Sequence, residues 1–154
     1  MKIERITDEC RKVRIAREIL LGLPDWFGLP DRTNNYIEAC GELPFWACFE
    51  GPAWVGFLAL KQTAPRSVEI FVMGVLPEYH RRGIGAGLWH AAKAYAKAQG
   101  YLYAQVKTVE SGHYPEYDRT NAFYRAVGFE ALECFPDLWD PRNPCQVYVQ
   151  YIAD

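Results

Sequence analysis

Residues 72–88 constrain the fold of this chain more than any other segment, because a strand, a glycine-rich turn and a helix follow one another there. Residues 68–75 are predicted to form a long strand. Residues 84–99 repeat apolar side chains at helical spacing, and Gly100 follows them, which is typical of a helix end. The turn between strand and helix carries two arginines and three alternating glycines: Arg81, Arg82, Gly83, Gly85 and Gly87.

This turn has the features of an anion site. Glycine has no Cβ, so the backbone can approach a ligand closely. The first turn of a helix presents unpaired N–H groups and a partial positive charge, which suit a diphosphate. Arg81 and Arg82 add fixed positive charge. Glycines at a helix start are also compatible with close packing alone, and glycine spacing by itself does not decide between the two interpretations.

Two other phosphate-binding patterns do not fit the turn. A P-loop requires a lysine after its last glycine, and none follows here. A dinucleotide fingerprint requires the spacing GxGxxG, whereas Gly87 is followed by Leu88, Trp89 and His90. The acidic residue expected after the next strand of a Rossmann site is missing as well.

The remaining pattern predicts an α/β protein around one mixed sheet, because helices and hairpins come first and strands alternate with helices later. A chain of 154 residues fits one domain, and residues 1–154 are taken as that domain. The expected strands are residues 2–6, 45–50, 54–61, 68–75, 102–108, 129–134 and 146–152. The expected helices are residues 8–21, 31–40, 84–99 and 120–126.

Two motifs of the chain resemble the GNAT superfamily of acyl-CoA-dependent N-acyltransferases. The first is His80-Arg81-Arg82-Gly83-Ile84-Gly85, which is similar to the family's [Q/R]-x-x-G-x-[G/A] signature between a strand and a helix. His80 departs from that signature, at a position that contributes through its backbone in the family. The second is Asn121-Ala122-Phe123-Tyr124-Arg125-Ala126-Val127-Gly128-Phe129, which resembles the family's N-x-x-[F/Y]-Y-x-x-x-G-F region with one position shortened.

The resemblance implies a GNAT-like, mostly antiparallel sheet of six to seven strands, splayed in the middle and flanked by about four helices. It implies acetyl-CoA as co-substrate, with the pantetheine arm paired to backbone groups of Met73 and Val75. The Val75 N–H is then expected to polarise the thioester carbonyl. The cofactor-binding residues implied in this way are Met73, Val75, His80, Arg81, Arg82, Gly83, Ile84, Gly85, Ala86, Asn121 and Tyr124.

Acyl transfer to an amine needs a base and an acid. Tyr124 matches the family's recurrent acid, and its phenol is protonated at pH 7. Glu69 is the expected base, because the family's protein-lysine acetyltransferases carry a glutamate at the corresponding strand position. Alternation places Glu69 on one strand face with Phe71 and Met73. The alternatives are a core tyrosine at 124, a structural carboxylate at 69 and a water chain in place of the base.

Composition limits the partners. The 17 basic and 19 acidic side chains leave a net charge of -2, which disfavours nucleic acid. Five cysteines without CxxC spacing and three scattered histidines give no metal pattern and indicate reduced thiols in the cytoplasm. No apolar run reaches membrane-spanning length. The expected acceptor is an amine, a small molecule rather than a protein, held by the first two helices and the loop at residues 111–118. A homodimer is left open.

Three functions are compatible with these observations. An N-acetyltransferase is favoured, because Asn121 and Tyr124 accompany the phosphate turn. A non-catalytic CoA- or acyl-CoA-binding sensor or interaction module is the alternative. A nucleotide-phosphate binder is the third, and competition between ATP and CoA separates it from the other two.

Overall fold

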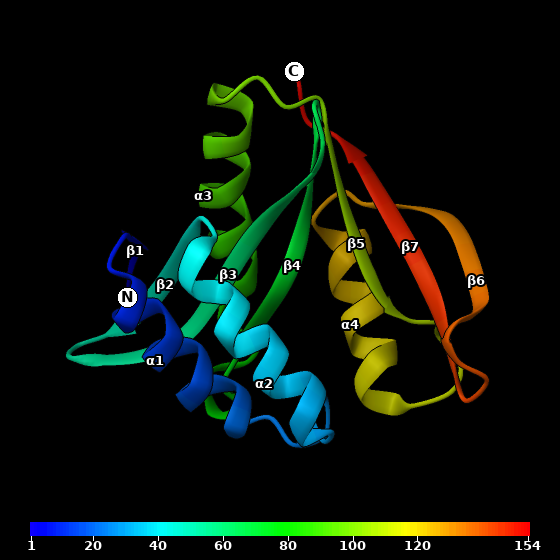
Figure 1. Ribbon diagram of the computed structural model, residues 1–154, viewed down its shortest axis with the longest axis horizontal. Coiled ribbons are helices and arrows are strands. Elements are labelled where there is room, and N and C mark those ends of the chain that lie inside the picture. The colour runs from blue at the N-terminus through cyan, green and yellow to red at the C-terminus, as the bar shows by residue number, and fades with distance from the viewer. The chain divides into compact units, whose positions relative to one another are not determined.

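The computed structural model describes residues 1–154 and contains seven β-strands and four α-helices (Figure 1). The strands form one sheet in the order β1-β2-β3-β4-β5-β7-β6. The β4–β5 pair is parallel, and the pairs β1–β2, β2–β3, β5–β7 and β6–β7 are antiparallel. The predicted α/β class, with a mixed and mostly antiparallel sheet and about four helices, is therefore confirmed.

The element bounds are close to those expected from the sequence. The strands are β1 (Lys2–Ile6), β2 (Phe45–Glu50), β3 (Ala53–Ala64), β4 (Ser67–Val75), β5 (Tyr103–Val109), β6 (Glu130–Asp140) and β7 (Asn143–Tyr151). The helices are α1 (Glu9–Leu21), α2 (Pro30–Ala39), α3 (Ile84–Ala98) and α4 (Pro115–Ala126). Two short 3-10 helices, Cys40–Glu42 and Pro77–Tyr79, lie between them.

The chain divides into two compact units. The first comprises Met1–Lys61 and Phe71–Ala96, and the second comprises Gln62–Ile70 and Lys97–Asp154. Strands β3 and β4 each contribute residues to both units.

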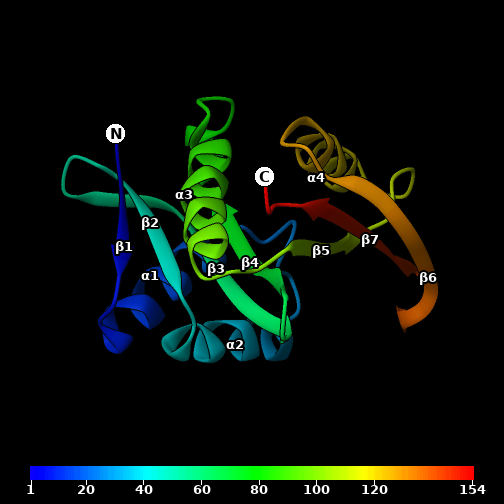
Figure 2. The same cartoon turned by 90° about the horizontal axis from the view of Figure 1, so that it is seen from above.

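In the first unit, helices cover both faces of the strands. Figure 2 shows α1 and α2 on one side of β2 and β3, with α3 on the other. Ile15 and Ile19 of α1 and Ile37 of α2 are fully buried in one apolar cluster with Phe45 and Phe57 of the strands. Burial of such side chains stabilises a fold by about 1.5–3 kcal/mol each.

The opposite face of these strands packs against α3. Trp46 of β2 contacts Tyr95 of α3 edge to face, with ring centroids 5.3 Å apart. A Cβ at Gly87 would lie 2.7 Å from the end of the Ile3 side chain, so α3 approaches β1 closely where glycine leaves room for that side chain. Because strand β2 is covered on both sides, five of its six residues are buried, and it reads as a continuous apolar run.

In the second unit, β5, β7 and β6 form an antiparallel ladder, and α4 packs against one face of it. Strand β5 pairs with β7 from Tyr103↔Tyr151 to Val109↔Cys145. The parallel pairing of β4 with β5 covers three residue pairs, Ser67↔Tyr103 to Glu69↔Gln105. Tyr124 of α4 contacts Tyr148 of β7, which anchors the helix on the ladder.

The sequence placed two boundaries of the second unit wrongly. Helix α4 begins at Pro115, five residues before the predicted start at 120. Proline suits the first helical position, and Glu116 and Asp118 in the first turn stabilise the helix start. The expected acceptor loop at residues 111–118 is therefore half helical. Strand β6 also continues beyond residue 134 to Asp140, across a register irregularity after Phe135.

No helix combines the length and the apolar character needed to cross a bilayer. No group of three or more His, Cys, Asp or Glu side chains is arranged to hold a metal ion.

Candidate active site

The turn between β4 and α3 has an unusual backbone. Arg81 has φ of 63° and is the one residue other than glycine with positive φ, and Gly83 follows with φ of 78°. A left-handed conformation costs a non-glycine residue about 1–2 kcal/mol. Backbone strain of this kind persists where the surrounding structure imposes it, and it is concentrated at ligand sites.

This backbone leaves N–H groups free at the start of α3. The Gly87 N–H donates to the Gly83 carbonyl at 3.0 Å and begins the helical ladder. The N–H groups of Ile84, Gly85 and Ala86 precede that bond, so they have no acceptor within the helix. A Cβ built on Gly83 would meet no atom within 4 Å, which leaves the space in front of this backbone open.

Two side chains of the turn are held by neighbours. The His80 Nε2–H donates to the Val75 carbonyl at 2.6 Å, and the His80 ring lies edge-on to Trp26 at 5.8 Å. The Arg82 guanidinium lies over the Tyr79 ring, 5.1 Å from its centroid. His80 thus ties the turn to the end of β4, a side-chain role that the sequence comparison with the family signature did not suggest.

The predicted alternation of side chains along β4 is interrupted near this turn. Phe71 packs against Tyr36 of α2, with centroids 5.2 Å apart. The Val75 side chain lies instead beside Gly56, where a Cβ would also contact Ile84 of α3. Strict alternation would place residues 71 and 75 on the same face, so β4 changes register between them. Such irregularities are common beside functional sites because they redirect backbone and side chains.

In the second unit, Tyr124 is 6% exposed on α4 and packs against Phe129 and Tyr148. Burial raises the pKa of the Tyr124 phenol, and the neighbouring Tyr117 and Glu69 raise it further. The hydroxyl therefore stays protonated across the neutral range, as a proton donor requires.

The Asn121 side chain lies at the centre of a buried hydrogen-bond network. Its amide nitrogen donates to the carbonyls of Val109 at 2.8 Å and Tyr117 at 2.7 Å. Its amide oxygen accepts from the Tyr148 hydroxyl at 2.5 Å, and that hydroxyl accepts from Arg125 at 3.0 Å. Asn121 is fully buried, so its side chain holds α4 against β5 and β7.

Glu69 forms an ion pair that the sequence did not suggest. The Lys107 Nζ donates to Glu69 Oε2 at 2.7 Å. The side chains are 11% exposed for Glu69 and 32% for Lys107. The register Glu69↔Gln105 accounts for the contact, because Lys107 stands two residues farther along the same face of β5.

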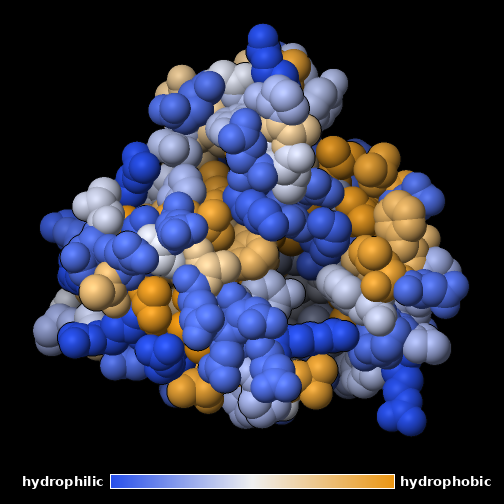
Figure 3. All heavy atoms as spheres, in the orientation of Figure 1, coloured by the Kyte–Doolittle hydropathy of each residue, from blue (hydrophilic) through white to orange (hydrophobic).

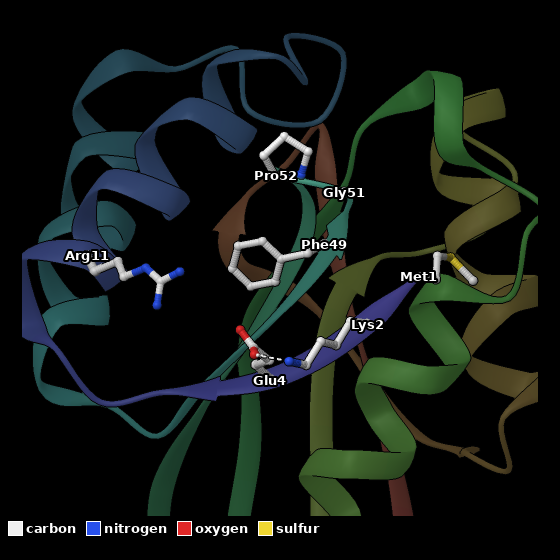
Figure 4. Close-up of a pocket in the computed structure, with 7 residues that line it drawn as sticks. All are labelled: Met1, Lys2, Glu4, Arg11, Phe49, Gly51 and Pro52. Carbon is white, nitrogen blue, oxygen red and sulfur yellow. Dashed lines mark ion pairs between the residues drawn. The ribbon is translucent and has the colours of Figure 1, made fainter.

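A surface hollow of about 460 Å³ lies elsewhere in the first unit, at the β1 edge (Figure 4). Its polar groups are the Lys2–Glu4 ion pair and Arg11, whose guanidinium lies over the Phe49 ring. None of the predicted site residues lines it, and we do not assign the chemistry to this hollow.

A family model described as the acetyltransferase (GNAT) family matches residues 11–129, a span that includes both the turn before α3 and Tyr124. The chain belongs to the GNAT family. It is accordingly an acyltransferase.

The relatives of this GNAT protein agree on the family and differ in what they act on. The N-alpha-acetyltransferase RimI of Mycobacterium tuberculosis is 34% identical over 79 residues, which cover 51% of this chain and 45% of that relative. A candidate GNAT acetyltransferase of Desulfovibrio desulfuricans superposes with a TM-score of 0.83 at 15% identity, over 99% of both chains. An aminoglycoside 6'-N-acetyltransferase in complex with coenzyme A has a TM-score of 0.75 at 14% identity, over 99% of this chain and 97% of that one.

The residues predicted for the GNAT site fall into the two units as follows. The first unit holds Met73, Val75, His80, Arg81, Arg82, Gly83, Ile84, Gly85 and Ala86, and the second holds Glu69, Asn121 and Tyr124. Within the second unit Glu69 is close enough to Tyr124 to influence its pKa.

Sequence reasoning missed Lys107 and Tyr148 in this acyltransferase. Tyr148 lies on the terminal strand and reaches Asn121 across 27 positions of the chain. Lys107 reaches Glu69 across 38 positions. A predicted register for the β4–β5 pair is the one signal that points to Lys107 in advance.

Proposed function

We propose that this protein transfers the acetyl group of acetyl-CoA to a primary amine by direct attack within a ternary complex. The observation that carries the proposal is the turn before α3. There Arg81 has a positive φ, the space in front of Gly83 is open, and the N–H groups at the start of the helix have no acceptor within the helix. We also propose that residues 1–154 act as one N-acetyltransferase domain. The family match supports this, because it spans parts of both units.

The turn suits the diphosphate of CoA. The N–H groups of Gly83, Ile84, Gly85 and Ala86 are the proposed donors to phosphate oxygens, and Arg81 and Arg82 supply charge. Each charge-assisted hydrogen bond contributes about 1.5–3 kcal/mol. Tyr79 favours this role for Arg82, because its ring restrains the guanidinium at the turn.

Backbone groups of Met73 and Val75 are proposed to pair with the pantetheine arm, as one strand pairs with another. The Val75 N–H is the proposed donor to the thioester carbonyl. The bond from His80 uses the carbonyl oxygen of Val75, so it is compatible with that role. The solved relative in complex with coenzyme A supports this choice of co-substrate.

Two protons have to move. An alkylammonium with pKa near 10.4 is neutral in only about one molecule in a few thousand at pH 7, so a base that removes its proton matters greatly. Glu69 is the proposed acceptor of that proton. As nitrogen bonds to the acetyl carbon and the carbon–sulfur bond breaks, Tyr124 donates its proton to the leaving sulfur. The nitrogen then loses its second proton, which restores the Tyr124 phenol, and Glu69 releases the first proton to solvent.

Asn121 is proposed to serve the cofactor site indirectly. Its amide nitrogen and oxygen are bonded to Val109, Tyr117 and Tyr148. These bonds favour a role in holding α4, and with it the Tyr124 hydroxyl, over direct contact with CoA.

The test combines binding and turnover in the purified protein. Calorimetry with CoA should give micromolar affinity, and an excess of ATP should not displace it. Acetyl-CoA mixed with a panel of primary amines should release free thiol. Binding without release from any amine would instead identify the sensor or interaction module. Competition by ATP at equal concentration would identify the nucleotide-phosphate binder.

Arg82→Ala tests the phosphate site directly. We expect the variant to bind CoA about tenfold more weakly or worse, because a charge-assisted hydrogen bond is lost. The KM for the amine should stay within about twofold. Arg82→Lys keeps the charge and should recover part of the affinity. An unchanged CoA affinity in Arg82→Ala would remove Arg82 from the site.

We further propose a small-molecule acceptor, a cytoplasmic location and association as a homodimer. The five cysteines are unpaired, which supports a reducing compartment. Strand β6 is a sheet edge that exposes Leu132, Phe135 and Leu138, and exposed apolar edges favour association. Sedimentation at several protein concentrations tests the homodimer.

A further inference from the structure

The Glu69–Lys107 ion pair has the properties of a recognition site for the acceptor. Lysine commonly buries its stem and keeps its ammonium in water, where the ammonium can also meet a ligand. Lys107 is 32% exposed, and its ammonium is directed at the carboxylate proposed as the base. The pair is thus open to solvent on the Lys107 side.

Both partners keep bonding capacity for a ligand. Lys107 uses one of its three N–H donors on Glu69 Oε2, which leaves two donors. The bond uses Oε2, and a carboxylate can accept further hydrogen bonds at its second oxygen, which is the proposed partner of the ammonium. The two opposite charges together add no net charge, so the pair gives no electrostatic preference to a polycationic acceptor over a monocation.

The surroundings add an apolar surface. Val149 of β7, which is half-buried, lies directly opposite Gln105 of β5, and Val147, opposite Lys107, is buried beneath it. Figure 3 shows hydrophobic residues gathered over β7 and β6 on one face of the second unit. The Gln105 amide nitrogen donates to the Thr63 hydroxyl at 3.3 Å, so polar groups border the ion pair on this side.

We propose that the acceptor is a free α-amino acid with an apolar side chain, recognised at two points by this pair. The α-ammonium binds Glu69, which removes its proton, and the α-carboxylate on the next carbon binds Lys107. The apolar side chain contacts Val149 of β7. This inference rests on the proposed acetyltransferase function and narrows its acceptor from any primary amine to one with a neighbouring carboxylate.

Three matched acceptors test the proposal: L-phenylalanine, L-phenylalaninamide and 2-phenylethylamine. They differ only in the group next to the amine, and leucine with its amide and 3-methylbutylamine repeats the series. The measurement is kcat/KM for thiol release from acetyl-CoA. We expect the amino acid to exceed both other acceptors by about tenfold or more, because each lacks the carboxylate that pairs with Lys107.

Variants separate recognition from the basicity of each amine. Lys107→Met should lower the preference for the amino acid to the ratio that the basicity of the amines alone sets. The ratio of the wild-type preference to the Lys107→Met preference is then free of the pKa differences among the acceptors. Lys107→Arg should retain most of the preference. Glu69→Gln should slow all three acceptors alike, and Lys93→Met on α3 is the matched control without effect.

The outcomes distinguish a failure of this inference from a failure of the proposed acetyltransferase function on which it rests. Thiol release with no preference for the carboxylate, or a preference unchanged in Lys107→Met, overturns the inference alone. Absence of thiol release from every amine overturns the proposed function and this inference with it. If Lys107→Met fails to fold, the wild-type kcat/KM values, each divided by the neutral fraction of its amine, together with Lys107→Arg keep the test decisive.

Discussion

The turn before α3 and the network under α4 make their contacts over very different distances in the sequence. In the turn, His80 reaches Val75 five positions away, and Gly87 bonds to Gly83. Under α4, Asn121 bonds to Tyr148 across 27 positions, and on the opposite face of β5 Lys107 bonds to Glu69 across 38. The conformation of the turn is therefore set by residues close in sequence, whereas the network depends on the register between strands that are far apart in sequence.

The two regions also use different groups. The turn offers main-chain N–H groups, and its residues matter through φ and through the absence of a Cβ. The network offers side chains whose roles depend on burial and partners, such as the raised pKa of Tyr124. Substitutions should accordingly act on binding and backbone strain in the first region, and on rate and packing in the second.

The largest expected effect tests whether a substitution in the second region changes the rate of turnover and not the binding of CoA. Tyr124→Phe removes only the hydroxyl, so kcat for thiol release should fall by about 100- to 1,000-fold. The affinity for CoA, measured by calorimetry, should change by less than about twofold. Tyr103→Phe, at the surface of β5, is the matched control. Wild-type turnover in Tyr124→Phe would show that this phenol is not the acid.

The next effect tests the network as a structural element. Asn121→Ala leaves the Val109 carbonyl and the Tyr148 hydroxyl without their partner, and we expect a loss of about 2–4 kcal/mol in the free energy of unfolding. Urea denaturation measures it. Asn143→Ala, in the β6–β7 turn, removes bonds to Asp140 in a more accessible place and should cost less than about 1 kcal/mol. Equal losses would refute the central position of Asn121.

A smaller effect is expected in the turn. Gly83→Ala forces a Cβ into a left-handed conformation and should cost about 1–2 kcal/mol of stability. Since a Cβ there meets no protein atom, the cost is conformational, and any larger loss of CoA affinity reports a clash with the ligand. Arg81→Gly is the converse variant and should raise stability by up to about 1 kcal/mol. Destabilisation by Arg81→Gly would mean that the strain is not local.

The smallest expected effect is a change in the free energy of unfolding with pH, which we follow through one buried thiol of each unit. Burial raises the pKa of Cys40 in the first unit to about 12 and that of Cys145 in the second to about 11. Free thiols titrate near 8.5, so the unfolded chain ionises first as the pH rises. The stabilisation is complete below about pH 8.5 and is lost progressively above it, by about 0.8 kcal/mol for each thiol at pH 9.

Urea denaturation at pH 7.5 and pH 9 measures this loss. Cys40→Ala and Cys145→Ala should each reduce the pH dependence by about 0.8 kcal/mol, and exposed Cys10→Ala should leave it unchanged. Cys48 is also buried with a raised pKa and should keep its own contribution. A pH dependence that persists in the double variant would have to come from other groups.

The sequence predicted the local features of the fold well. Strands β1 and β2 lie at the predicted residues, and α3 begins at Ile84 as predicted, because periodicity and glycine punctuation are local signals. The start of α4 was missed although Pro115 and its acidic neighbours mark it, since the aromatic and polar residues before it resemble a loop.

What the sequence by itself determined is the glycine-rich turn, the helix that follows it and the family to which both point. A backbone conformation such as that of Gly83 depends on neighbours in the chain, so the chain alone encodes it. Only the tertiary structure decided that Lys107 pairs with Glu69, that Asn121 spends its amide on β5 and β7, and that β4 changes face after Phe71. Those partners are set by the register between strands far apart in sequence, and a shift of one residue would turn each side chain to the opposite face.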